Sequence, residues 1–333
     1  MESLQPKRAV EMYLQERSND VTEATLYSHK SRLSHFVDWC EEKELDDLNE
    51  LSGRDLHEFK LHRRSSGINK VTEKTQLDTL RVFIRWCESM DAVPENLSQA
   101  VQSPDLQRKE NVRDEILEGE RAEQILEYLN KYEYASFRHV LFMLLFKCGM
   151  RIGGARATDV SDVDEENLSL QIEHRPKSDT PLKNQADGNR FIALSSSQTR
   201  VLEDYIEENR IEVEDEFNRR PQLSTTQGRA HTNTLRSYIY QLTRPCMLSD
   251  ECPHGYDIDE CEYNSWSSAS SCPSSVSPHS VRRGSITHHL LEDVPNTVVS
   301  DRMNVGNDTL EKHYDRRSLE EKMEQRRDHL NGI

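Results

Sequence analysis

Two stretches of the sequence carry side chains of the kind that hold a phosphate group. Ser277 is a good helix N-cap and Pro278 suits the first helical position, so His279 and Arg282 fall three residues apart on one helix face. An imidazole and a guanidinium at the positive end of a helix form a natural phosphate site, or equally a solvated helix cap. Arg151 follows an expected helix end, where its guanidinium could enter a cleft or form a surface ion pair.

Tyr314 is a third candidate for chemistry, and it lies in the charged stretch "TLEKHYDRRS" at 309–318. A tyrosine that only packs would normally have apolar neighbours, and this one has acidic and basic neighbours along the chain. The sequence therefore predicts a reactive role for its hydroxyl. That prediction depends on the upstream arginines and histidine.

The N-terminal part of the chain is expected to fold as successive helices joined by short turns, from residue 7 to about residue 90. Ser52 precedes Asp55 by three residues, a variant of the capping box that predicts a helix start. Trp39 and Trp86 lie in two similar apolar stripes, and we expect them to fill one helical core.

A polar stretch over 103–112 separates this part from the next, and Pro104 within it cannot continue a helix. We therefore expect one domain over 1–106 and a second over 107–333.

The second part combines helices with a few strands. An amphipathic helix over 121–132 precedes an apolar helix over 137–149, which Gly149 can end in a left-handed conformation. Two strand-like runs follow, at 168–174 and 190–195, joined by a long polar loop. The remainder is expected to be helical except for an insert at 246–272, so the fold class is mainly α with a small β-sheet (α+β).

Composition limits the class of protein. A chain of 333 residues with 34% hydrophobic content can form two cores, and its apolar residues recur at helical spacing, which argues against global disorder. No run of 18 apolar residues appears, and the first ten residues lack the apolar segment of a signal peptide. We therefore expect a cytoplasmic protein that does not bind membranes.

The charge balance points to an unusual environment. The chain has 60 acidic and 43 basic residues, a net charge of -17, and arginine outnumbers lysine. An acidic, lysine-poor surface is typical of proteins kept soluble in concentrated salt, so the sequence indicates a halophilic source. Net negative charge ordinarily argues against nucleic-acid binding. In molar salt, however, counterion release contributes little, and binding would depend on local arginines, hydrogen bonds and shape.

The insert carries four of the seven cysteines and is polar and acidic. In a cytosolic protein such cysteines are poor core material and argue for metal binding over disulfides. A structural zinc ion would fix this loop, with Cys₄ or, through His254, Cys₃His ligands. The predicted ligands are Cys246, Cys252, Cys261 and Cys272. Their spacings match no standard CxxC knuckle, and reduced, uncoordinated thiols are the alternative.

Taken together, Arg151, the run His279-Ser-Val-Arg282 and Tyr314, 35 residues after that histidine, resemble the tyrosine recombinase family of phage-integrase and Xer-type enzymes. The stretch "LLFKCGMRIGGARATDVSDVD" is similar to the family's first arginine box, and "MNVGNDTLEKHYD" is similar to its last box. The helical N-terminal part resembles the family's core-binding domain. The resemblance covers nearly the whole chain.

This resemblance implies a helical, SAM-like core-binding domain followed by a catalytic domain that cleaves and rejoins DNA through a 3'-phosphotyrosine bond. Arg151 and Arg282 would hold the non-bridging phosphate oxygens, Tyr314 would attack, and His279 would handle the proton. Because the covalent bond stores the energy of the phosphodiester, rejoining needs neither ATP nor a metal, and no cofactor is expected for catalysis.

In the family, a lysine in a turn between two strands gives a proton to the leaving 5' oxygen. The polar loop offers Lys177 and Lys183, and Lys183, which is closer to the returning strand, is the predicted donor. The alternative for either lysine is a solvated loop charge.

The sequence departs from the family pattern at two positions. Gly154 stands where an acidic residue usually orients the first arginine, and Val305 stands where a histidine or tryptophan usually bonds the phosphate. Losing one such donor costs on the order of 10²-fold in rate. Asn304 or Asn307 could substitute for that donor.

The leading interpretation is a site-specific recombinase that acts on double-stranded DNA as a homo-tetramer on paired sites. The charged segment after Tyr314 would form a short helix that docks on a neighbouring subunit, or a frayed tail. The competing interpretation is a zinc-containing, catalytically weakened DNA-binding regulatory protein on the same scaffold. A relaxing type IB topoisomerase, which shares the chemistry without paired sites, is a third.

Overall fold

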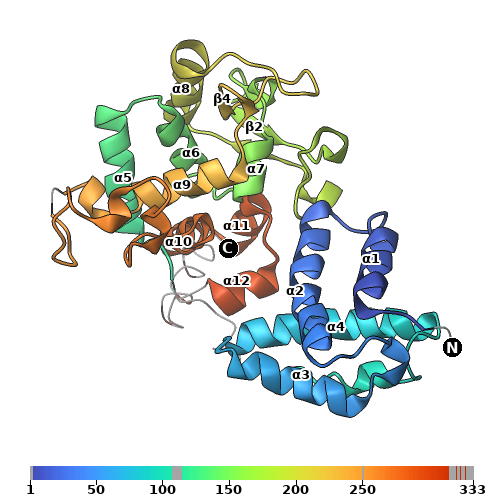
Figure 1. The fold of residues 1–333 in the computed structure, drawn as a ribbon. Helices are drawn as coiled ribbons and strands as arrows, with labels where there is room; N and C mark the ends of the chain where they lie inside the picture. Colours follow the sequence, from blue (N-terminus) through green and yellow to red (C-terminus); the bar gives the residue numbers. More distant parts are fainter. Residues whose placement is uncertain are drawn as a thin grey trace. The chain divides into compact units, whose positions relative to one another are not determined.

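The structure is a computed structural model that describes residues 3–106, 115–249 and 251–314, together with the single positions 320, 323 and 327. The chain divides into two compact units, Met1–Arg113 and Asp114–Ile333 (Figure 1). The boundary predicted between residues 106 and 107 adjoins residues 107–114, which lie outside the described part of the chain. That boundary, and the helix predicted after Tyr314, stay predictions.

The first unit is helical, as the apolar spacing predicts. Its elements are α1 (Pro6–Arg17), α2 (Glu23–Glu42), α3 (Gly53–Ser65) and α4 (Lys70–Ser89), with 3₁₀ turns at Leu48–Glu50 and Leu97–Ala100. Side-chain oxygens cap three of the helix starts, those of Thr22, Ser52 and Asn69. Ser52 and Asp55 form the reciprocal capping box that their spacing predicts.

An aromatic cluster forms the core of the first unit. Phe36, Phe59 and Phe83 are fully buried, and their rings make edge-on and stacked contacts with Trp39 and with each other. Trp86 packs at the edge of the same core, half-buried, with its indole N–H donating to a carboxylate of α1 at 3.0 Å. The prediction that both tryptophans belong to one core is confirmed.

The second unit consists of eight helices and five short strands among its described residues. Its helices are α5 (Gly119–Tyr132), α6 (Phe137–Phe146), α7 (Ile152–Ala157), α8 (Ser196–Asp204), α9 (Thr232–Leu242), α10 (Pro278–Leu291), α11 (Asn296–Met303) and α12 (Asn307–His313). Its strands are β1 (Val163–Asp164), β2 (Ser169–Ile172), β3 (Arg190–Ala193), β4 (Ser224–Thr225) and β5 (Gly228–Arg229).

The main sheet is antiparallel, in the order β1-β2-β3. Leu170 of β2 lies opposite Ile192 of β3 and both are fully buried, whereas the neighbouring Phe191 is 69% exposed, as the two-residue period of a strand requires. Both predicted strands are thus present, β2 three residues and β3 two residues shorter than expected. The β4–β5 hairpin was not expected, because strands of two residues are too short to show a periodic pattern.

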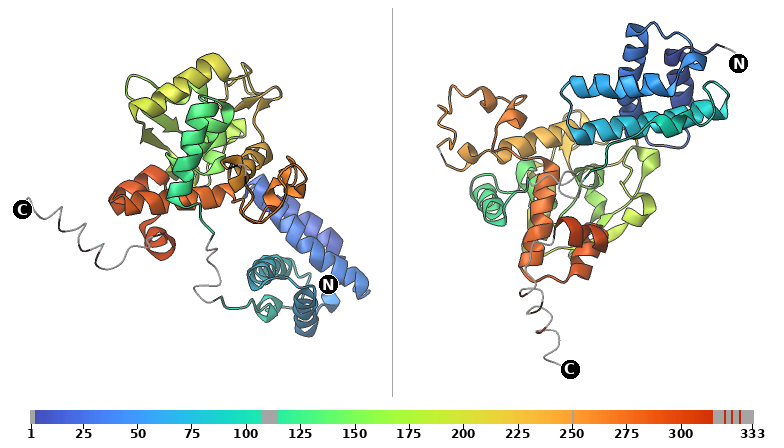
Figure 2. Two further views of the ribbon diagram at one scale, coloured as in Figure 1. Left: turned by 90° about the vertical axis from the view of Figure 1, so that its left-hand side faces the viewer. Right: turned by 90° about the horizontal axis from the view of Figure 1, so that it is seen from below.

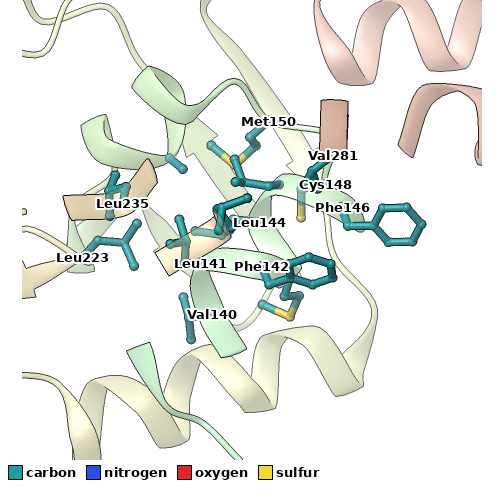
Figure 3. Packing of buried hydrophobic residues seen from close by; sticks show 14 of the residues in the cluster. Val140, Leu141, Phe142, Leu144, Phe146, Cys148, Met150, Leu223, Leu235 and Val281 are labelled. Carbon is teal, nitrogen blue, oxygen red and sulfur yellow. The ribbon is translucent and has the colours of Figure 1, made fainter. Parts of the chain in front are cut away.

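Helix α6 lies at the centre of the second unit. All its residues from 139 to 146 are buried, which is why its sequence is apolar on every side (Figure 3). Val281 reaches this core from α10. Gly149 follows α6 with a φ of +58°, confirming the predicted left-handed turn, and a Cβ there would collide with the side chain of Met303.

Helix α10 begins as the sequence predicts, with Ser277 accepting the backbone N–H of Ser280 and Pro278 in the first turn. Behind it, α11 and α12 complete a small apolar cluster that includes Ile286, Val299 and Leu310. Among the described residues, no helix has the length and apolar character needed to cross a bilayer.

Candidate active site

Arg282 is the most buried of the predicted site residues, with 2% of its surface exposed. Its guanidinium donates to the carbonyl oxygen of Met303 at 2.6 Å and to that of Gly149. Arg282 therefore ties α10 to the turn before α7 and to the end of α11.

Arg151 lies at the N-cap position of α7, directly before the first helical residue. Its Nη1 donates to Oδ1 of Asn304 at 3.3 Å, across 153 positions of sequence. Asn304 has a φ of +48° and ends α11 in a left-handed conformation, which asparagine tolerates well. The group that holds Arg151 is therefore an amide from the segment that leads to Tyr314.

Arg190, the first residue of β3, belongs to the same site, and the sequence did not single it out. Its Nε donates to the carbonyl oxygen of Arg302 at 2.8 Å and its Nη1 to that of Gly188 at 2.9 Å. Burial, and next the charge of Arg151, lower the pKa of Arg190 to about 10. In the sequence, Arg190 was marked only by its position at the start of the second predicted strand, directly after the lysine-bearing loop.

The electrostatics of the site are set by three mutually repelling guanidinium groups. The pKa of Arg282 falls to about 9, mainly through burial and then through Arg151, with Arg190 acting in the same direction. Burial also lowers the pKa of Arg151, while Tyr314 opposes this shift. Buried positive charge without a negative partner is costly, so this arrangement favours binding of an anion.

The ion pairs elsewhere in the unit show what is different about this site. Asp159 pairs with Arg229 at 2.6 Å and with Arg219 at 2.7 Å, and Asp162 pairs with Arg175 at 2.5 Å. By contrast, no ion pair between described residues joins Arg151, Arg190 or Arg282 to a carboxylate; these three donate to an amide and to backbone carbonyls. The charges of Arg175, Arg219 and Arg229 are thus balanced by carboxylates within the fold. The charges of the three site arginines are left for a ligand.

Tyr314 directly follows α12 and is 8% exposed. It packs with the apolar residues of α10, α11 and α12, so the idea that it lacks apolar company is wrong: its apolar neighbours come from distant segments. The guanidinium carbon of Arg283 lies 5.9 Å from the ring centroid, and Thr287 donates to the tyrosine's carbonyl oxygen at 3.4 Å. Tyr314 also lies within electrostatic reach of both Arg151 and Arg282.

His279 lies exposed in the first turn of α10. Partial removal from water lowers its pKa, as do the charges of Arg282, Arg283, Lys183 and Arg151. Lys183 therefore lies in the electrostatic neighbourhood of the site, and the choice between Lys183 and Lys177 stays a prediction. Both lysine side chains are exposed.

The structure shows what surrounds the site at the two positions that depart from the family pattern. Gly154 has no side chain that could orient Arg151, and Asn304 accepts a hydrogen bond from Arg151 in its place. Val305 is 7% exposed and packs into the apolar cluster around Tyr314, so it offers nothing to a phosphate. One N–H of the Asn304 amide donates to the carbonyl oxygen of Asp187 at 2.8 Å, and the amide has a second N–H, so the substitute donor role of Asn304 or Asn307 stays a prediction.

Residues 115–320 match the family model described as the phage integrase family. The chain belongs to the phage integrase family. No curated protein sequence matches it. Its site is thus that of an integrase-family protein, built on the unit that the match covers.

Solved integrase structures share the fold of the chain. The integrase of the Tn1549 transposon, in complex with a circular-intermediate DNA, matches with a TM-score of 0.67 at 13% identity over 98% of this chain and 99% of that one. A lambda integrase dimer bound to a COC' core site matches with a TM-score of 0.63 at 14% identity, over 95% and 79%. The N-terminal domain of a phage integrase/site-specific recombinase from Haloarcula marismortui is 34% identical over 31% of this chain and 100% of that domain, with a TM-score of 0.31.

These matches confirm the predicted fold class, a helical N-terminal domain followed by a mainly helical catalytic domain with a small sheet. The function is that of a site-specific recombinase, and the regulatory alternative is not favoured.

The cysteine-bearing insert of this integrase is not a preformed metal site. Among residues 3–106, 115–249 and 251–314, no three His, Cys, Asp or Glu side chains are arranged so that they could hold an ion. The insert thiols nevertheless lie near one another: burial first, and then the charges of Cys272 and Cys252, raise the pKa of Cys246, while Arg244 opposes the shift. All seven cysteines are free thiols.

Proposed function

We propose that this protein cleaves and rejoins double-stranded DNA with Tyr314 as the nucleophile and with Arg151 and Arg282 as the phosphate clamp. The observation that carries this proposal is the gathering of Arg151, Arg190 and Arg282 beside Tyr314 without a carboxylate among the described residues. A phosphodiester group supplies the anion that these charges require. The planar donor forks of arginine suit its non-bridging oxygens.

The phenol oxygen of Tyr314 attacks the phosphorus atom and the bond to the 5' oxygen breaks, leaving a 3'-phosphotyrosine bond. Negative charge grows on the non-bridging oxygens during this displacement, and Arg151 and Arg282 stabilise it there. His279 accepts the phenol proton, and its lowered pKa keeps the imidazole in the neutral, accepting form near neutral pH. Lys183 donates a proton to the leaving 5' oxygen.

Rejoining runs these steps in reverse, with a 5' hydroxyl attacking the phosphotyrosine. The covalent bond stores the energy of the phosphodiester, so the family chemistry requires no catalytic cofactor. No step passes through the cysteine-bearing insert.

We further propose a homo-tetramer acting on paired DNA sites in the cytoplasm of a halophilic archaeon. The net charge of -17 and the preference for arginine over lysine support the saline setting. In such a setting, a dense local cluster of arginines has to replace the broad basic surface of an ordinary DNA-binding protein.

A trapping experiment tests the nucleophile. The full chain is incubated in high salt with an end-labelled library of nicked duplexes of randomised sequence, in which strand cleavage releases a short fragment and prevents rejoining. We expect a covalent protein–DNA adduct on a denaturing gel, absent in Tyr314→Phe and retained in the matched control Tyr132→Phe, whose side chain is 63% exposed. Mass spectrometry of the adduct should place the nucleotide on the peptide that contains Tyr314.

An adduct that persists in Tyr314→Phe would overturn the assignment. So would wild-type protein that binds the duplexes and never forms an adduct. Relaxation of a supercoiled plasmid by the wild-type chain, without any joining of paired sites, would favour the topoisomerase interpretation.

A further inference from the structure

The insert between α9 and α10 has little apolar material to hold its shape. Its described residues form three short 3₁₀ turns, at Pro245–Met247, Glu262–Asn264 and Ala269–Ser271, and both views of Figure 2 show it as a loop-rich segment beside α9. Its buried apolar side chains are few, chiefly those of Ala269 and Val276. Hydrophobic burial alone is therefore a weak explanation for an ordered insert of this length.

One small pocket collects the sulfur-bearing side chains of this insert. The four thiols that line it come from separate positions of the loop: Cys246, Cys252, Cys261 and Cys272. His254 lines the same pocket. The free volume inside the pocket is about 10 Å³, close to the volume needed for one water molecule. The three remaining cysteines of the chain are buried elsewhere, in the helical cores.

A buried positive group also faces this pocket. Arg244 is 5% exposed, and its Nη1 donates to the carbonyl oxygen of Tyr263 at 2.8 Å and to Oδ1 of Asn264 at 3.0 Å. Its Nε is buried and has no hydrogen-bond partner among the described residues. An unsatisfied buried guanidinium nitrogen indicates that negative charge or an acceptor belongs next to it.

We propose that the insert binds one structural Zn²⁺ through the thiolates of its four cysteines, Cys246, Cys252, Cys261 and Cys272. On binding, each thiol releases a proton to solvent, so four protons leave and the ZnCys₄ centre carries a net charge of -2. Arg244 lies where it can balance that charge and donate from Nε to a thiolate. The thiols are not yet arranged around a common point, so binding draws them together, which a loop-rich segment permits.

His254 supports the centre from outside the ligand set. Its Nε2 is already hydrogen-bonded to Oγ of Ser274 at 2.8 Å, which holds the Cys252 end of the loop against the Cys272 end.

The ion would set the position at which α10 begins. Val276 donates from its backbone N–H to Oγ1 of Thr243 at 3.0 Å, and Ser277 then caps α10. Fixing Cys246 and Cys272 in one centre would therefore fix both ends of the insert, and with them the helix that carries His279 and Arg282. This role does not depend on the DNA chemistry of the site.

Metal analysis of the full chain tests the proposal. Protein purified in high salt under reducing conditions and passed over a chelating resin is expected to retain about one zinc per chain. Cys252→Ser and Cys261→Ser should lose it, whereas Cys40→Ser, in the helical core of the first unit, and His254→Gln should keep it. Co²⁺ exchanged into the wild-type chain should give the intense visible bands of tetrahedral tetrathiolate coordination, which keeps the test valid if a variant fails to fold.

Substoichiometric zinc in folded wild-type protein, with all four insert thiols reacting freely with a thiol reagent, would overturn the proposal. A disulfide within the insert in protein purified without reductant would do the same. Loss of zinc in His254→Gln, with cobalt bands of a three-thiolate centre, would overturn the four-cysteine ligand set.

Discussion

At the residue scale, Asn304 is the most informative side chain of the site. Its Oδ1 accepts from Arg151 at 3.3 Å and from Nδ2 of Asn184 at 2.5 Å, while its own Nδ2 donates to the carbonyl oxygen of Asp187. One amide therefore joins the first arginine to the loop that carries Lys183. A neutral acceptor in this place leaves the charge of Arg151 available, whereas a carboxylate would neutralise part of it.

Removing this amide should slow strand cleavage. Asn304→Gly keeps the left-handed backbone without strain and deletes only the side chain. Loss of the orienting hydrogen bond to a charged group is worth about 1.5 kcal/mol, so we expect a roughly tenfold lower cleavage rate with DNA affinity nearly unchanged. Single-turnover cleavage of a trapping substrate measures this.

Asn218→Gly is the matched control, since Asn218 is an exposed asparagine that also has a left-handed backbone, with a φ of +55°. It should cleave at the wild-type rate. If Asn218→Gly slows the reaction as much as Asn304→Gly does, or if Asn304→Gly has no effect, the orienting role assigned to Asn304 is wrong.

His279 predicts a pH dependence of cleavage. Its folded pKa lies below the ordinary value of 6.5, and the neutral imidazole is the form that accepts a proton. The rate constant kcat/KM, which reports the free enzyme, should therefore be level above about pH 6.5 and fall as the pH drops through the lowered pKa. In His279→Gln this acid limb should disappear and the rate should fall about 100-fold.

The exposed His57 of the first unit provides the control, because His57→Gln should keep both the rate and the acid limb. An acid limb that survives unchanged in His279→Gln would show that another group handles the proton.

The sequence identified the chemistry-bearing side chains by type and spacing, and it could not show how they are held. Arg151 and Asn304 meet across 153 positions, and Arg190 donates to a carbonyl 112 positions away. Such contacts leave no local pattern, because backbone carbonyls accept regardless of residue type. Tyr314 was misread for the same reason: its apolar neighbours belong to other helices.

At the element scale, α10 carries two of the proposed site residues and must lie close to the loop segment before α5. The backbone N–H of Leu117 donates to the carbonyl oxygen of Ser280 at 3.2 Å. Gly284 makes this approach possible, since a Cβ there would collide with the carbonyl group of Leu117.

Gly284→Ala should consequently destabilise the fold even though alanine is the better helix former. Overpacking against rigid backbone costs about 1–3 kcal/mol, more than the gain of about 1 kcal/mol in helix propensity. Gly153→Ala in α7 is the matched control, because a Cβ there meets nothing within 4 Å, and it should be neutral or slightly stabilising. Thermal unfolding of the two variants measures the difference, and equal Tm values would show that α10 can shift away.

Elements with a strong period or a defined cap were predictable from the sequence. The apolar run of α6, the capping box at Ser52 and the cap of α10 at Ser277 all lie where their residues place them. The β4–β5 hairpin and the π-helical turn at Tyr205–Asn209 were not predictable, because they are short and are fixed by tertiary contacts.

At the scale of the whole molecule, the apolar cores keep to separate parts of the chain. Among the described residues, the buried members of one cluster lie between Ala9 and Val101, and those of the other two lie between Leu117 and Tyr314. Each unit thus has its own hydrophobic core, as an independently folding domain requires.

A chain of this kind should unfold in two steps. Scanning calorimetry of the full protein in high salt is expected to resolve two transitions, and a fragment of residues 1–106 should be helical and reproduce one of them. A single cooperative transition, together with an unfolded fragment, would show that the first unit depends on the second. The predicted boundary would then have to be redrawn.

The place of Arg282 has a consequence for variants of this protein that have lost activity. Its guanidinium links two turns of the chain through their main-chain carbonyl oxygens, so Arg282 stabilises the fold in addition to its proposed contact with a phosphate. A descendant that no longer cut DNA would still need this arginine to keep its fold. Retention of this arginine is therefore poor evidence that a homologue is active, and surface groups such as His279 are more sensitive markers of a working enzyme.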